Sequence, residues 1–162
     1  MRSNISVNIV SAHAEGEVGN VIVGGIPDPP GNDLWEMRTF IEKDQKLRNL
    51  LLNEPRGGVF KHINLLVKAK HPNAEFGFII MEPIHTPPMS GSNAICVATV
   101  LLETGLIKIE EPITSFNLDT PAGLIQVRAT CRDGEALKIE IQNVESFVDQ
   151  LNAPLKINGL GI

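Results

Sequence analysis

The segment Pro87-Pro88-Met89-Ser90-Gly91-Ser92-Asn93 runs directly into an apolar stretch, Ala94-Ile95-Cys96-Val97-Ala98-Thr99-Val100-Leu101-Leu102. The prolines end any secondary structure that precedes them, and Ser90 and Ser92 are residue types that favour the start of a helix. Gly105 supplies a stop signal. The segment therefore predicts a helix that is apolar all round, and such a helix has no solvent face and belongs inside the domain.

The start of this helix is a candidate binding site. Its first-turn backbone N–H groups and the positive end of its dipole favour an anion such as a carboxylate, and the Ser90 hydroxyl lies there. On spacing alone, a helix cap that satisfies one backbone N–H is the simpler interpretation of Ser90. The stretch lacks the G-x-S-x-G pattern, so a hydrolase that uses Ser90 is the weakest alternative.

The remaining elements follow from apolar periodicity. Residues 32–52 predict an amphipathic helix that is capped by Asn32 or Asp33 and broken near Lys43-Asp44. The segment 144–151 fits a short helix or a bend. Residues 155–162 look like a turn that enters another strand, which suggests part of a longer protein. Alternating or continuous apolar residues predict strands at 5–9, 18–23, 59–67, 75–81, 114–118, 123–130 and 136–142.

These elements predict an α/β (α+β) fold with a curled, mostly antiparallel sheet around one buried central helix and a second helix outside. A length of 162 residues suits a single domain, 1–162. The formal charge of −5 argues against nucleic acid, and no apolar run reaches the roughly 18 residues of a membrane span. Two cysteines outside any paired motif and the lack of a leader pattern indicate a cytoplasmic protein.

Other polar residues have simpler interpretations on spacing alone. His13, Glu15 and Glu17 lie close together but lack a convincing set of metal ligands, so we expect no metal site. Glu54 and Arg56 fit a surface turn with an ion pair. Cys96 is expected in the core, and neither it nor Cys131 has neighbours that would lower a thiol pKa.

Five ordered segments together resemble the proline racemase family, which includes hydroxyproline 2-epimerases and trans-3-hydroxy-L-proline dehydratases. The resemblance covers the chain but only the N-terminal half of a family member, and it implies one half of a diaminopimelate-epimerase-like fold. The segments are His13-Ala14-Glu15-Gly16-Glu17, Gly24-Gly25-Ile26-Pro27, Glu54-Pro55-Arg56-Gly57, Met89-Ser90-Gly91-Ser92-Asn93 and Asp119-Thr120-Pro121-Ala122-Gly123.

The resemblance implies a reaction without a cofactor, in which side chains from two halves remove and return a proton at the substrate Cα. Ser90 matches the position of the first catalytic cysteine. Gly91, Ser92 and Asn93 would bind the substrate carboxylate, with Ser92 in place of a frequent histidine. The resemblance leaves four further residues around the site without a clear role: His13, Glu15, Glu54 and Arg56.

Serine at position 90 favours a hydroxyproline over proline as the small-molecule substrate, because a hydroxyl is a poorer base than a thiolate. Epimerization and dehydration both remain open, since the opposing cysteine or threonine belongs to the half that is absent. A catalytically inactive module that binds a pyrrolidine carboxylate, or a scaffold, is the alternative. The surface that a partner half would cover suggests a homodimer.

Overall fold

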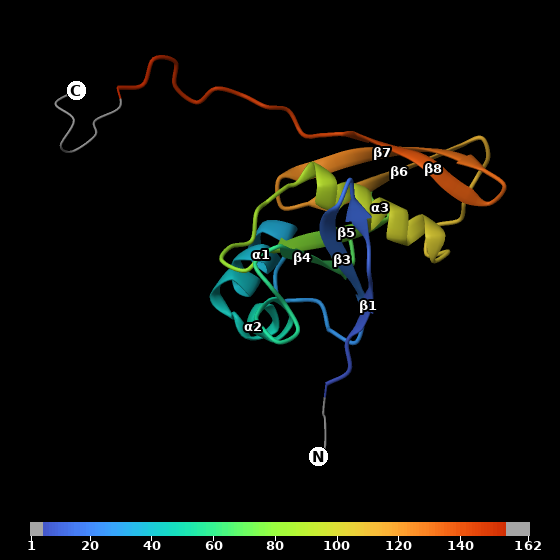
Figure 1. Cartoon of the computed structure of the whole chain (residues 1–162). Helices are drawn as coiled ribbons and strands as arrows, with labels where there is room; N and C mark the ends of the chain where they lie inside the picture. The colour runs from blue at the N-terminus through green and yellow to red at the C-terminus, as the bar shows by residue number, and fades with distance from the viewer. Residues whose placement is uncertain (1–4, 155–162) are drawn as a thin grey trace.

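The computed structural model describes residues 5–154, which form three helices and eight strands. Figure 1 shows their arrangement in space. The elements are β1 (Asn8–Val10), β2 (His13–Ala14), β3 (Glu17–Gly24), α1 (Leu34–Lys43), α2 (Lys46–Leu52), β4 (Lys61–Val67), β5 (Phe76–Met81), α3 (Gly91–Glu103), β6 (Ile113–Thr120), β7 (Gly123–Arg132) and β8 (Glu135–Gln142).

The strands form one sheet in the order β1-β3-β4-β5-β6-β7-β8, with β2 paired to β3. The β3–β4 and β5–β6 pairs are parallel, and all other pairs are antiparallel. The predicted fold class is therefore confirmed. The parallel β3–β4 pair has a structural consequence, because α1 and α2 form the crossover between its strands.

The two faces of the sheet carry separate cores. Along β3 and β5, successive residues alternate between them: Val21 and Phe78 face α3, whereas Ile22 and Ile79 face α1 and α2. Helix α3 thus lies on the opposite face from α1 and α2 (Figure 1). Strands covered on both faces read as continuous apolar runs, which explains the sequence of β5.

Helix α3 is buried as the apolar segment predicted. Its buried residues include Asn93, Ala94, Val97 and Leu101. Ser90 is the N-cap, whereas Ser92 lies inside the first turn, and the helix ends at Glu103 with Thr104 as its C-cap before Gly105, whose φ is 72°. This positive φ is the conformation that glycine adopts without strain.

The amphipathic helix is broken where the sequence predicted, with Asp44 and Gln45 between α1 and α2. Asp33 is the cap, because its Oδ1 accepts a hydrogen bond from the Glu36 backbone N–H at 2.7 Å. Asn32, the other predicted cap, instead donates its backbone N–H to Glu36 Oε2 at 2.8 Å.

The largest differences lie near the ends of the chain. The predicted strand at 5–9 begins only at Asn8, because Asn8 pairs with Gly24, the last residue of β3, and residues 5–7 have no strand beside them. Strand β2 was not predicted. Residues 144–151 contain a bend but no helix and run away from the sheet (Figure 1). The predicted final strand at 155–162 lies outside the described residues.

None of the helices between residues 5 and 154 is both long and apolar enough to cross a membrane.

Candidate active site

Four elements bring polar side chains to the start of α3. Strands β3 and β4 run parallel with Gly19 beside His62, so Glu17, at the start of β3, lies near His62. Strand β5 runs antiparallel to β4 with Met81 beside Ile63, which places Glu82 on the other side of His62. The beginnings of two strands and the end of a third therefore surround the N-terminus of α3.

Ser90 caps α3 and also belongs to a side-chain network. Its Oγ accepts the Asn93 backbone N–H at 3.5 Å and the Asn93 Nδ2–H at 3.1 Å. The Ser92 Oγ lies 3.1 Å away. The cap interpretation is thus confirmed, and the same oxygen is half-buried among further polar groups. We call Ser90, Ser92, Asn93, Asn64 and His62 the α3 polar cluster.

Asn93 links the cluster to the sheet. Its side chain is 1% exposed, and its Oδ1 accepts a hydrogen bond from Asn64 Nδ2 at 2.9 Å. Asn64 Nδ2 also donates to the backbone carbonyl of Asn20 at 3.3 Å. Because a carbonyl only accepts, this contact fixes the orientation of both amides. Asn93 therefore presents its nitrogen to Ser90.

His62 lies between two carboxylates. Its Nδ1 is 3.2 Å from Glu17 Oε1 and 3.3 Å from Asn93 Nδ2, and its Nε2 is 3.9 Å from Glu82 Oε1. Glu82 Oε2 in turn lies 3.3 Å from His85 Nε2. The ring is mostly buried, with 19% of its side chain exposed. Through Nδ1, His62 thus contacts the amide that holds Ser90.

The first turn of α3 is open to an anion. It contains no acidic residue. Within residues 5–154, no acceptor is hydrogen-bonded to the backbone N–H of Gly91 or Ser92. Gly91 is exposed and Ser92 is half-buried. These N–H groups, with the positive end of the helix dipole, can bind a carboxylate.

Besides burial, the negative charge of Glu17 affects the pKa of Cys96, which lies about one turn further along α3. Burial, and after it the negative charge of Glu17, raises the pKa of the Cys96 thiol. Cys96 packs against Gly19, where an added Cβ would lie 2.8 Å from the Cys96 Sγ. Cys96 is a core residue, as predicted. Cys131 is also buried, and its Sγ lies 3.4 Å from Thr114 Oγ1.

Four residues of the predicted site are not hydrogen-bonded to the α3 polar cluster. His13, on β2, accepts the Gly16 backbone N–H at its Nδ1, and Glu15 lies in the turn that follows with a φ of 50°. Arg56 donates to the backbone carbonyl of Leu50 at 2.9 Å. The ion pair expected between Glu54 and Arg56 is not formed among the described residues, because the Arg56 guanidinium donates to the Leu50 carbonyl instead.

Sequence reasoning missed His62, Asn64 and Glu82. One signal was available: after Lys61, His62 and Asn64 are the polar residues of an otherwise apolar strand and lie two positions apart, so both point to the same face. Glu82 gave no signal, because only the antiparallel pairing of β4 with β5 brings it to His62. Residues 5–154 contain no group of three or more histidine, cysteine, aspartate or glutamate side chains that could hold a metal ion.

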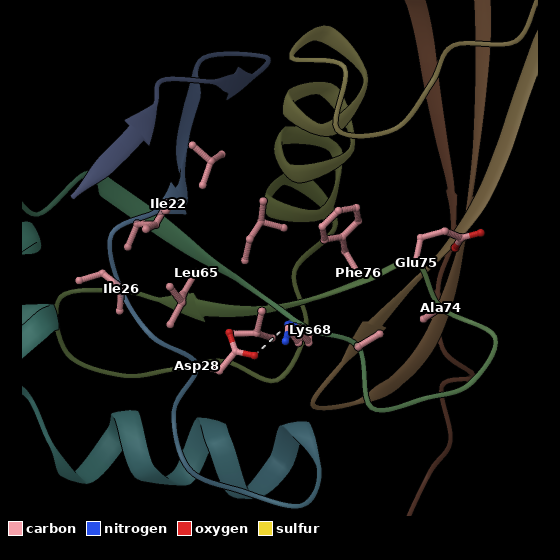
Figure 2. A pocket seen from close by; sticks show the side chains of 13 residues that line it. Ile22, Ile26, Asp28, Leu65, Lys68, Ala74, Glu75 and Phe76 are labelled. Atoms are coloured by element: carbon pink, nitrogen blue, oxygen red, sulfur yellow. Dashed lines mark hydrogen bonds between the residues drawn. The ribbon is translucent and has the colours of Figure 1, made fainter. Parts of the chain in front are cut away.

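A separate hollow of about 460 Å³ lies at the other end of β3 and β4 (Figure 2). Ile22, Leu65 and Phe76 give it an apolar lining. Its carboxylates are already bound: Asp28 Oδ2 accepts the Lys68 backbone N–H at 3.2 Å, and Glu75 Oε2 accepts the Asn117 backbone N–H at 2.8 Å. The start of α3 therefore remains the better candidate site.

Comparison with known proteins identifies the family of this chain. The family model for proline racemase matches residues 9–162. The chain belongs to the proline racemase family. It is similar to a hydroxyproline epimerase from Agrobacterium vitis, whose crystal structure holds trans-4-hydroxy-L-proline, with 39% identity and a TM-score of 0.90. It is also similar to a probable proline racemase from Agrobacterium radiobacter K84 with bound carbonate, with 44% identity and a TM-score of 0.86.

This member of the proline racemase family spans about half the length of these two relatives. The match covers 97% of the chain and 47% of the A. vitis protein, and 90% of the chain and 44% of the A. radiobacter protein. A methylitaconate-delta-isomerase is 16% identical with a TM-score of 0.55, a likeness of fold alone.

Proposed function

We propose that this chain forms one half of the active site of an amino-acid epimerase that removes and returns the α-proton of a hydroxyproline without a cofactor. The observation that carries the proposal is the Ser90 hydroxyl, which lies at the open N-terminus of the buried helix α3 and accepts a hydrogen bond from Asn93 Nδ2 at 3.1 Å. Family membership and the 39% identity to a hydroxyproline epimerase support it.

The substrate carboxylate binds at the first turn of α3. The backbone N–H groups of Gly91 and Ser92 have no acceptor among the described residues, and an amino-acid carboxylate provides two oxygens for them. Binding there places the adjacent Cα next to Ser90. The same donors stabilise the negative charge that spreads onto the carboxylate when the α-proton leaves.

Ser90 acts as the proton donor in this scheme. Its Oγ accepts from Asn93, and with Ser92 as the donor in the Ser90–Ser92 hydrogen bond its own O–H is available to the substrate. The bonds that it accepts stabilise the alkoxide left behind. A base on the opposite side takes the α-proton, and the carbanion then takes the Ser90 proton at Cα with inversion. The reverse reaction returns the proton to Ser90.

The opposing base comes from a second domain or from a second copy of this chain. Residues 1–162 constitute one of two similar halves in this proposal. Exposed apolar side chains adjoin the candidate site, as the second half would require: Val59 and Phe60 precede β4 and are 91% and 65% exposed, and Ile84 follows β5 and is 86% exposed. Burial of such side chains favours association.

A hydro-lyase reaction uses the same half-site. In trans-3-hydroxy-L-proline, loss of the α-proton followed by departure of the 3-hydroxyl as water requires only one base at Cα. Ser90 would then protonate the departing hydroxyl rather than Cα.

The two free, buried cysteines fit a reducing compartment, and we propose the cytoplasm as the location.

Proton NMR in deuterated water tests this function. The full-length native protein is incubated with trans-4-hydroxy-L-proline, trans-3-hydroxy-L-proline or L-proline. Loss of the Cα proton signal reports exchange, a new diastereomer reports epimerization, and an imine product reports dehydration. Ser90→Ala should lower the rates of all three by about 10²–10⁴-fold, whereas Ser115→Ala, on the exposed face of β6, is the matched control. Exchange that continues at its original rate in Ser90→Ala would refute the role of Ser90.

A binding module without catalysis is the second candidate. It is favoured by one observation: the hydrogen-bond partners of Ser90 are Ser92 and Asn93, and neither is a base. The same observation weighs against a serine hydrolase, in which a histidine contacts the nucleophile. Calorimetric titration with pyrrole-2-carboxylate would show binding without turnover, and a flat titration would remove this candidate.

A further inference from the structure

His62 faces two partners whose demands on one ring nitrogen are incompatible. Asn93 Nδ2, at 3.3 Å, requires that Nδ1 of His62 accept a hydrogen bond. Glu17 Oε1, at 3.2 Å from the same atom, requires that Nδ1 carry a proton and donate it. A neutral imidazole with its proton on Nε2 satisfies Asn93, whereas a ring with a proton on Nδ1 satisfies Glu17. Of the two ring forms with a proton on Nδ1, the neutral tautomer turns the Nε2 lone pair toward the Glu82 carboxylate, so the imidazolium is the favoured one.

Asn93 cannot resolve this conflict by turning its amide over. Its Oδ1 already accepts from Asn64 Nδ2 at 2.9 Å, and Asn64 Nδ2 is held in turn by the Asn20 carbonyl. Both amides are buried, Asn93 at 1% and Asn64 at 0% exposure. The side of Asn93 that faces Ser90 and His62 is therefore always a donor, and only the protonation of His62 can change.

The Nε2 side of the ring allows either protonation state. Glu82 Oε1 lies 3.9 Å from Nε2, and its negative charge favours a proton on that nitrogen whether Nδ1 is protonated or not. His85 shares the Glu82 carboxylate at 3.3 Å and is half-exposed. On the α3 side, the nearby titratable group is the buried Cys96 thiol, which also faces Glu17. Lys61, next to His62 on β4, is held by the Arg56 carbonyl at 3.0 Å.

We propose that His62 is a positioning residue whose protonation controls the hydrogen bonding of the Ser90 hydroxyl. Neutral His62 accepts one Asn93 Nδ2 hydrogen and so keeps the amide in place, with the other hydrogen directed to Ser90 Oγ. Protonated His62 donates to Glu17, and its N–H repels that of Asn93. The Asn93 side-chain amide shifts, and Ser90 Oγ loses the shorter of its two hydrogen bonds from Asn93, keeping from that residue only the backbone N–H at 3.5 Å to stabilise its alkoxide.

This inference rests on the proposed function for its catalytic consequence, whereas the exchange of hydrogen bonds itself requires no substrate. Two consequences follow. The Asn93 side-chain amide should respond to pH together with the His62 ring, and Ser90-dependent proton transfer should decline on the acid side as His62 becomes protonated.

The first arm of the test is ¹⁵N NMR of the chain without substrate. The imidazole nitrogens of His62 and the Nδ2–H resonances of Asn93 are followed across the acid-to-neutral range. We expect both to change with one midpoint, and that midpoint to move to lower pH in Glu17→Gln because the carboxylate that stabilises the imidazolium is gone. An Asn93 amide that does not follow His62 would overturn the proposal without any variant.

The second arm measures the pH profile of kcat for α-proton exchange in the full-length protein. His62→Asn places a side-chain amide near the position of Nδ1, where its oxygen accepts from Asn93 at every pH. We expect the acid-side decline of kcat to disappear while KM changes little. The matched control is His71→Asn, because His71 Nδ1 also accepts a single N–H, from Asn73 at 3.2 Å, at the other end of β4.

The outcomes separate the two proposals. An acid-side decline that persists unchanged in His62→Asn would show that Ser90 is insensitive to His62 and would overturn this inference, while exchange itself would still support the proposed function. Coupled NMR midpoints in a protein that exchanges none of the three amino acids would refute the proposed function and support the hydrogen-bond exchange at His62.

Discussion

Helices α1 and α3 both begin with an oxygen-bearing cap, and yet only α3 has an N-terminus that is open to a ligand. At α1, Asp33 Oδ1 accepts the Glu36 backbone N–H, and the Glu36 carboxylate reaches back to Asn32. Two acidic side chains thus neutralise the positive end of the α1 dipole. At α3 the cap is an uncharged serine, and the first turn contains no acidic residue.

The comparison shows that cap geometry alone does not make a site. Asp33 and Ser90 occupy the same position relative to their helices, and both accept the backbone N–H three residues later. The difference lies in charge and in surroundings. In both helices the first two backbone N–H groups have no acceptor among the described residues, but at α1 the carboxylates of Asp33 and Glu36 occupy the helix start, whereas at α3 the uncharged cap belongs to a buried network that reaches the sheet.

Replacing each cap residue with alanine, in separate variants, is the most direct test of this comparison. Ser90→Ala should lower α-proton exchange by about 10²–10⁴-fold, the usual contribution of a general acid or base. Asp33→Ala should leave exchange unchanged. Each variant should lower the free energy of unfolding by about 1 kcal/mol, the usual cost of a lost cap. Denaturant titration and NMR exchange rates measure the two effects, and equal loss of exchange in both variants would make Ser90 merely a structural cap.

The fit of α3 against the sheet provides the next test. In Gly19→Ala the new Cβ would lie 2.8 Å from Cys96 Sγ and 3.0 Å from Asn93 Oδ1. We expect a loss of roughly 1–3 kcal/mol in the free energy of unfolding, the usual cost of overpacking. Gly91→Ala is the control, because its Cβ would meet nothing within 4 Å. Urea titration of both variants checks the difference, and equal stabilities would contradict the close contact.

Giving α3 an acidic first turn should make it resemble α1. Ser92→Asp adds a carboxylate near the free N–H groups, which should stabilise the helix by about 0.3–1 kcal/mol. The same carboxylate competes with a bound anion, so affinity for pyrrole-2-carboxylate should fall. Ser92→Asn, of similar size without charge, is the control. Calorimetry decides, and undiminished affinity in Ser92→Asp would place the carboxylate site elsewhere.

The smallest expected effect concerns the Cys96 thiol. Burial first, and Glu17 second, holds the pKa of Cys96 above its ordinary value of 9.0. Glu17→Gln removes the second cause, so the pKa should fall slightly and still remain raised. Alkylation by iodoacetamide as a function of pH, read at Cys96 by peptide mass spectrometry, measures this. A midpoint unaffected by Glu17→Gln would mean that burial alone raises the pKa of the Cys96 thiol.

The raised pKa also has a consequence for stability. The folded protein holds the Cys96 proton more tightly than the unfolded chain does, so the neutral thiol contributes its full stability below pH 9.0. That contribution is lost as the pH rises from this value to the higher pKa that Cys96 has in the folded protein. In Cys96→Ala the corresponding alkaline decline in the free energy of unfolding should be smaller, as urea titrations at several pH values would show.

Much of the scaffold was predictable because local residues determine it. Pro87, Pro88 and Ser90 set the start of α3, Gly105 its end, and the uninterrupted apolar run its burial. The break between α1 and α2 was equally local. The short strand β2 could not be predicted, because two residues carry no periodicity, and only their pairing with β3 orders them.

The sequence by itself determined which helix is buried, which residue caps it and that its first turn lacks acidic residues, since each depends on neighbours within a few positions. Only the tertiary structure brought together Glu17, His62 and Asn93, from elements far apart in the chain. Their meeting depends on the parallel β3–β4 register and on a glycine at position 19 that lets α3 approach. Strand order and close approach are properties of the packed sheet, which no local pattern encodes.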